Sequence, residues 1–75
     1  MKWNKTPPPK DGTAFIGCCD YPWPCAMVYN PCDDDYAVSV VSAETFSDGL
    51  NVWFETESCK ESEITAWMTM PEAEK

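Results

Sequence analysis

The side chains that could do chemistry in this 75-residue chain are thirteen carboxylates and five cysteines. The chain contains no histidine and no arginine. The commonest general base and the commonest clamp for phosphates or oxyanions are therefore missing. A carboxylate pair could still carry out acid–base chemistry, but nothing in the sequence sets two of the thirteen acids apart from the rest. We therefore predict a protein that is not an enzyme.

Four of the cysteines are close in sequence, at Cys18, Cys19, Cys25 and Cys32. Structural zinc sites usually use pairs of closely spaced cysteines, with the pair repeated once. These four residues lack that spacing, so a small zinc module built on them is an alternative, and the main prediction is no metal and no cofactor. Free cysteines commonly pack as small apolar residues. Cys59 stands among acids, which should raise the pKa of its thiol rather than activate it.

The net charge of −8 is the strongest global signal, and Lys2, Lys5 and Lys10 lie in a first segment without acids. An acidic chain should not bind nucleic acid directly but is attracted to basic protein surfaces. Ordinary solubility is the alternative explanation for such a charge. If a strand ran through Cys59, acids at every second position would lie about 6.6–6.8 Å apart along one face and could imitate a nucleic-acid backbone. The candidate partner-binding acids are Asp33, Asp34, Asp35, Glu55, Glu57, Glu61 and Glu63.

The elements that must position these residues are short strands. Runs of β-branched, aromatic and alternating residues predict strands over residues 13–18, 25–29, 36–42, 51–56 and 63–68. The stretch after Ser42 could hold one helical turn, but Asp48-Gly49 is the firmer signal, for a tight turn. We expect a mostly β, small single-domain antiparallel sheet of four or five short strands, curled or barrel-like, with an irregular proline-rich N-terminus.

The N-terminal segment "TPPPKDGT" is expected to be structural. It has too few glycines for a phosphate-binding loop, and a polyproline ligand at Pro7–Pro9 is only weakly indicated. Because the prolines hold the chain extended and Asp11-Gly12 favours a turn, we predict a clasp over residues 1–12. A β core over 13–70 and a tail over 71–75 complete the single domain, 1–75.

The alternation of side chains along the last two predicted strands indicates which face two of the tryptophans occupy. Val52 and Phe54 share one face, and Trp53 lies on the other. If the aliphatic faces point inward, Trp53 and Trp67 both point outward. The N-terminal segment could then cover them together with Trp3, or they could form a partner-binding patch. Such a patch would also permit a homo-dimer.

No stretch approaches the roughly 18 apolar residues of a membrane span, and the first residues do not form a secretory signal. We therefore predict a cytoplasmic protein, with its cysteines as free thiols in a reducing compartment.

The two ends of the chain carry a known pattern: Trp3, then "TPPPKDGTAFIG", and the ending "ITAWMTMPEAEK". This pattern resembles a small phage and prophage family catalogued as domain of unknown function five-five-one. The matching positions are Trp3, Pro9, Asp11, Gly12, Thr65, Trp67, Met68, Pro71 and Glu72. The Gly49 to Trp53 step is similar as well. Ala66 and Thr69 depart from the family pattern, which commonly has His and Pro there, and the cysteine-rich middle is not part of it.

The resemblance implies a phage accessory product made in a bacterial cytoplasm, with no catalytic residue and no cofactor. Together with the charge, it predicts a non-enzymatic protein that inhibits a bacterial nucleic-acid-targeting defence system, such as CRISPR or restriction. The acids would occupy a basic groove of the host protein, with Trp53 or Trp67 as an apolar anchor. The alternatives are a phage structural or assembly protein that oligomerises through an exposed tryptophan face and the zinc module.

Overall fold

The computed structural model describes residues 2–72, so residues 73–75 of the expected tail lie outside the described part. It contains one five-stranded antiparallel sheet in the order β4-β3-β2-β1-β5, and this sheet is not closed. The prediction of a mostly β, small single domain with an antiparallel sheet is confirmed, and of the two shapes considered, the closed barrel is not formed. The elements are β1 Phe15–Cys18, β2 Cys25–Asn30, β3 Asp35–Phe46, β4 Gly49–Cys59, the 3-10 turn η1 Glu61–Glu63, and β5 Ala66–Thr69.

The core lies on one face of the sheet, which we call the inner face. Phe15, Met27 and Val38 stand opposite one another on β1, β2 and β3, and all three are almost entirely buried. Tyr36 packs edge-on against Phe15 with ring centroids 5.7 Å apart. The packing is tight at Gly17, where a Cβ atom would lie 2.5 Å from the Sδ atom of Met27. The opposite surface of the sheet is called the outer face below.

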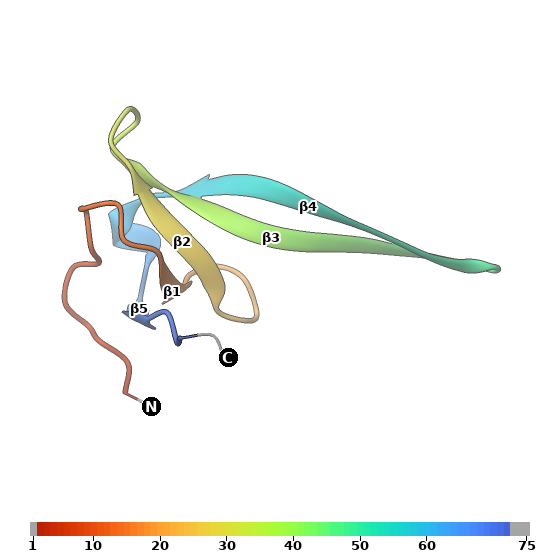
Figure 1. The fold of residues 1–75 in the computed structure, drawn as a ribbon, viewed down its shortest axis with the longest axis horizontal. Helices are drawn as coiled ribbons and strands as arrows, with labels where there is room; N and C mark the ends of the chain where they lie inside the picture. The colour runs from red at the N-terminus through yellow and green to blue at the C-terminus, as the bar shows by residue number, and fades with distance from the viewer. Residues whose placement is uncertain (1, 73–75) are drawn as a thin grey trace.

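The N-terminal segment runs beside the sheet (Figure 1), pairs with the free edge of β5 and contacts the inner-face side chains of Trp67 and Tyr36. The backbone N–H of Asn4 donates to the carbonyl of Trp67 at 2.7 Å, and the N–H of Trp67 donates back at 3.0 Å. The indole Nε1–H of Trp67 donates to the carbonyl of Thr6 at 2.9 Å, and the hydroxyl of Tyr36 donates to the carbonyl of Pro8 at 3.4 Å. Backbone groups of Asn4, Thr6 and Pro8 thus hold the N-terminal segment against β5 and β3, and we call this segment, residues 2–12, the clasp.

A turn ends this clasp at the predicted position. The carboxylate of Asp11 accepts a hydrogen bond from the N–H of Thr13 at 3.0 Å. Hydrogen bonding from the side chain of Thr13, followed by this backbone bond, lowers the pKa of Asp11. Gly12 has φ +89°, a backbone conformation that costs a glycine little and other residues much more. The Asp11-Gly12 turn is confirmed, and it directs the chain toward β1.

β3 and β4 leave the rest of the sheet together as a long hairpin (Figure 1). They pair continuously from Tyr36↔Cys59 to Phe46↔Gly49, whereas β2 pairs with β3 only as far as Val38. The expected strands 36–42 and 51–56 were therefore too short, and the possible helical turn after Ser42 is wrong. The β-branched and apolar residues beyond that point extend the ladder, and the turn before Gly49 is confirmed. We call residues 41–54 the arm.

No helix within residues 2–72 is long and apolar enough to cross a membrane.

Candidate functional site

Five of the candidate acids gather at one end of the sheet. The turn between β2 and β3 and the η1 turn lie at the same end, because Tyr36 near the start of β3 pairs with Cys59 at the end of β4. These turn-end acids are Asp33, Asp34, Asp35, Glu61 and Glu63. The sequence-based expectation that the aspartates lie near the glutamates is correct for this group.

Lys10 lies among the turn-end acids. Its Nζ is 3.0 Å from Oε1 of Glu61 and 5.6 Å from the ring centre of Tyr29. The hydrogen bond and the charge of Glu61 raise the pKa of Lys10. Both partners of the ion pair are about half exposed, so solvent screening leaves it a small contribution to stability.

Several of the turn-end carboxylates already accept hydrogen bonds within the chain. The hydroxyl of Tyr29 donates to Asp34 at 2.6 Å, and the N–H of Lys60 donates to Glu63 at 2.9 Å, which closes the η1 turn. Because β4 ends at Cys59, the predicted acidic row along one strand through Cys59 is wrong. The predicted strand 63–68 begins only at Ala66, because Glu61–Glu63 form the η1 turn instead. These acids hold turns in place, and a partner would have to compete with those bonds.

A second group of acids lies on the inner face of the β3–β4 hairpin. Trp53, Glu55 and Glu57 occupy alternate positions of β4 and therefore share a face. Trp53 is half-buried and pairs with Ser42, whose hydroxyl donates to the carboxylate of Glu55 at 3.2 Å. Three of the predicted site residues are thus brought into one row, which places an aromatic ring beside exposed carboxylates.

Sequence reasoning missed Glu44, which belongs to the same face. It pairs with Asn51 across the hairpin, one step beyond the Ser42–Trp53 pair on this face. Extending the alternation of the third strand past Ser42 would have found it. We call Glu44, Trp53, Glu55 and Glu57 the acid–tryptophan row.

The row follows β4 and β3 along the hairpin toward the tip of the arm. In the loop between β1 and β2, burial, followed by the negative charge of Glu57, raises the pKa of Tyr21.

Trp67, the other predicted anchor, belongs to the core. Its ring packs edge-on against Phe15 with centroids 5.9 Å apart, and its indole N–H is bound by Thr6. The prediction that Trp53 and Trp67 both point outward is wrong, because both lie on the inner face. The aliphatic residues of β4 occupy the outer face instead, since aromatic rings supply the inner cover.

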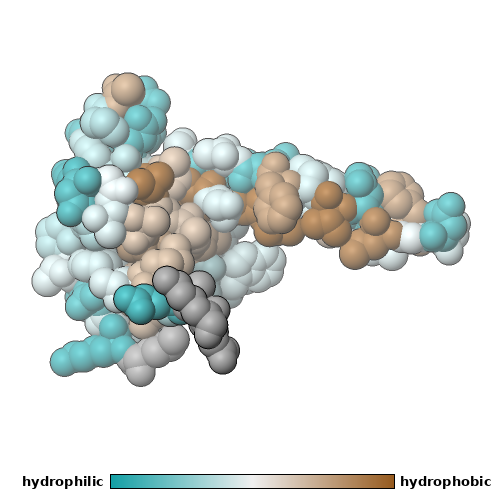
Figure 2. Space-filling view, in the orientation of Figure 1, coloured by the Kyte–Doolittle hydropathy of each residue, from teal (hydrophilic) through white to brown (hydrophobic). Residues whose placement is uncertain are grey.

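The outer face of the arm carries large apolar side chains in contact with solvent. Phe54 is 76% exposed and Leu50 is 64% exposed, and Val41 and Val52 are exposed beside them. Register puts these four on one face, because Val41 pairs with Phe54 and Ala43 pairs with Val52. Figure 2 shows hydrophobic side chains gathered along the arm up to a hydrophilic tip. The predicted alternation placed Val52 and Phe54 together on one face but assigned that face to the interior, and it did not include Val41 or Leu50.

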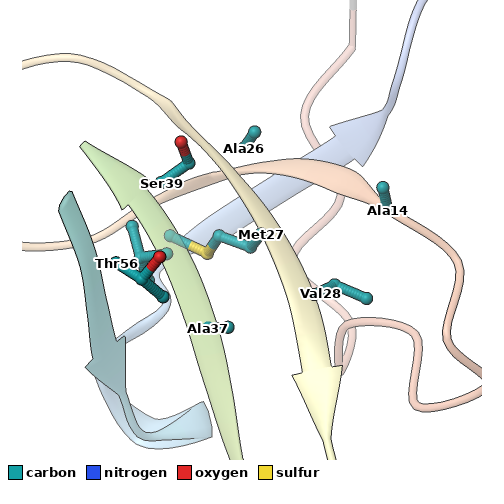
Figure 3. A pocket seen from close by; sticks show the side chains of 8 residues that line it. Ala14, Ala26, Met27, Val28, Ala37, Ser39 and Thr56 are labelled. Atoms are coloured by element: carbon teal, nitrogen blue, oxygen red, sulfur yellow. The ribbon is translucent and has the colours of Figure 1, made fainter. Parts of the chain in front are cut away.

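A shallow hollow of about 240 Å³ adjoins this apolar row at the base of the arm. Figure 3 shows mostly small side chains from β2, β3 and β4 around it. Thr56 belongs both to the hollow and to the row, since it follows Phe54 by two positions on β4. The lining residues are Ala14, Ala26, Met27, Val28, Ala37, Val38, Ser39 and Thr56.

The cysteines do not assemble the alternative zinc site. Cys25 begins β2 and is buried, whereas Cys32 is exposed in the turn beyond the other end of β2. Within residues 2–72, no three histidine, cysteine or acidic side chains lie close enough to hold a metal ion. Burial, followed by the nearby Cys19 and Glu63, raises the pKa of Cys59 to about 12, in the direction expected from its acidic neighbours.

The chain has no match among protein-family models, curated proteins or solved structures. The resemblance of its two ends to the phage family therefore stays a prediction.

Proposed function

We propose that this protein is a non-enzymatic phage accessory protein that binds a bacterial host protein through a basic, nucleic-acid-binding surface of that host protein. The target is a component of a defence system that acts on nucleic acid, of the CRISPR or restriction type. The host class comes from the resemblance of the chain ends, and the class of partner surface comes from the charge. Binding takes place in the host cytoplasm.

The acid–tryptophan row is the observation that carries this proposal. An exposed carboxylate on either side of a half-buried indole suits an arginine or lysine, which can pair with the acid and stack on the ring. Glu55 accepts a hydrogen bond from Ser42. Among residues 2–72, no lysine forms an ion pair with Glu55, so its negative charge stays available to a partner. The turn-end acids add long-range attraction, which speeds association with a basic partner.

Affinity capture from a bacterial lysate, with the partners identified by mass spectrometry, tests the proposal. The variant Glu44→Gln/Glu55→Gln/Glu57→Gln should bind the captured partner at least roughly tenfold more weakly. Removing one charge of a close ion pair at an interface lowers the affinity by at least about that factor. The matched control is Asp20→Asn/Asp48→Asn/Glu72→Gln, which changes the net charge equally at exposed positions outside the row.

We expect the control variant to bind nearly as well as the original chain, and we expect binding to weaken with added salt. The proposal fails if no basic nucleic-acid-binding protein is captured. It also fails if the two variants lose the same affinity, since the effect would then follow net charge rather than the row.

A further inference from the structure

The outer face of β2, β3 and β4 combines three properties that together indicate which molecule binds there. It is apolar, it is free of charge over most of its length, and it carries a projecting ring next to a hollow. We propose that this outer face is the interface of a homodimer in which Phe54 of each copy enters the hollow of the other. The proposal is independent of the acid–tryptophan row, which lies on the opposite face.

The absence of charge at this surface favours the close approach of a second copy. From Ala37 to Thr45 and from Leu50 to Ser58, the outer-face positions carry no acid and no lysine. A chain of net charge −8 repels its own copies, so they can approach closely only where acids are absent. By contrast, pairing along the free edge of β4 would bring Glu55 and Glu57 of both copies together.

Shape gives the self-complementarity that a two-fold interface requires. In such an interface, a residue and its contact partner exchange roles between the copies. Phe54, the most exposed large apolar residue of the described chain, stands two positions from Thr56 at the rim of the hollow. A two-fold axis between the ring and the hollow lets each ring fill the opposite hollow, where Ala26, Ala37 and Ser39 leave room.

Area permits a dimer of modest affinity. The twelve residues of β3 span roughly 40 Å, and three strands at ~4.8 Å spacing give a footprint of roughly 500 Å² per copy. Two copies would bury about 1,000 Å² in total, the lower bound for a specific interface. Sheets packed face to face lie about 10 Å apart, a distance that the exposed side chains of the two arms can fill.

Light scattering on a sizing column, from about 1 to about 300 µM, measures the dimer in the range expected for this area. We expect a concentration-dependent dimer. Phe54→Ser should raise the dissociation constant of the dimer at least about tenfold, as expected for a central aromatic residue. Ala26→Glu, which places a charge in the hollow from another strand, should do the same.

The matched control is Phe46→Ser, which removes the same ring from the inner face of the arm and should leave the dimer unchanged. Circular dichroism verifies that each variant keeps its sheet. The proposal is overturned by a protein that stays monomeric over the whole range, or by equal effects of Phe54→Ser and Phe46→Ser. A dimer that is strengthened by Glu55→Gln/Glu57→Gln and is insensitive to Phe54→Ser would indicate edge pairing along β4 and would also overturn it. Retention of partner capture by Phe54→Ser separates this outcome from that of the proposed function.

Discussion

The two halves of β3 follow the same alternation but have opposite environments. From Asp35 to Val40, every second side chain is buried, whereas from Val41 to Phe46 the side chains are exposed apart from half-buried Ser42. The difference comes from the layer above the strand. In the rest of the sheet outside the arm, which we call the body, Trp67, the clasp and the β1–β2 loop cover the inner face, whereas along the arm no comparable cover comes from residues 2–72. Alternation therefore defines two faces, and cover decides which of them becomes core.

The largest contrast is expected between two phenylalanines. Phe15→Ala, in the body, should lower the free energy of unfolding by about 3–5 kcal/mol, because it removes a fully buried ring that Tyr36 and Trp67 pack against. Phe54→Ala, in the arm, should change it by no more than about 0.5 kcal/mol in dilute protein. Urea unfolding measures both values, and Phe15→Leu gives a milder body variant if the first one does not fold. Equal losses at the two positions would remove the distinction between body and arm.

Two glycines test the same contrast between body and arm, with smaller expected changes in the free energy of unfolding. Gly17→Ala should cost about 1–3 kcal/mol, because its Cβ would meet the Sδ atom of Met27 inside the core. Gly49→Ala, at the tip of the arm, meets no atom within 4 Å and should be neutral to within about 0.5 kcal/mol. Thermal unfolding of the two variants checks the pair. A destabilised Gly49→Ala would mean that the arm is packed more tightly than its exposure indicates.

The smallest expected effect is a pH dependence located in the body. Burial holds the pKa of Cys59 near 12, above the ordinary value of 9.0, so the folded state keeps a proton that the unfolded state loses. Stability from this group is complete below about pH 9 and falls as the pH rises toward 12. Cys59→Ala should flatten the decline of unfolding free energy in that window. Cys32→Ala, at the exposed turn, serves as the control and should leave the decline as steep as before.

Local signals in the sequence led to correct predictions of several elements, but not of the η1 turn or of the start of β5. The strands around Phe15, Met27 and Val38 follow from alternation, and the turns at Gly12 and before Gly49 follow from residue type. The wrong face of β4 was assigned to the interior, because Phe54 and Trp53 alternate equally well whichever of them points inward. The register with β3 settles that choice, because the pairing of Val38 with Glu57 and of Ser42 with Trp53 puts Trp53 on the buried face of β3.

The candidate site was predictable in part for the same reason. Trp53, Glu55 and Glu57 were grouped correctly because they share one strand, whereas Glu61 and Glu63 were misplaced because the strand ends at Cys59. Glu44 and the apolar outer row depend on the length of the hairpin. That length is set by continuous pairing of two strands, which neither strand reveals alone.

The contact between Asn4 and Trp67 has a consequence for the order in which the molecule is made. During synthesis the whole β3–β4 hairpin leaves the ribosome before β5 does, so its nearest-neighbour pairing can form early. The cover over Phe15 has to wait until Trp67 has been added and can meet Asn4. A nascent chain therefore presents its arm while its core is still open, and hydrophobic surface on both faces is accessible to chaperones during that interval.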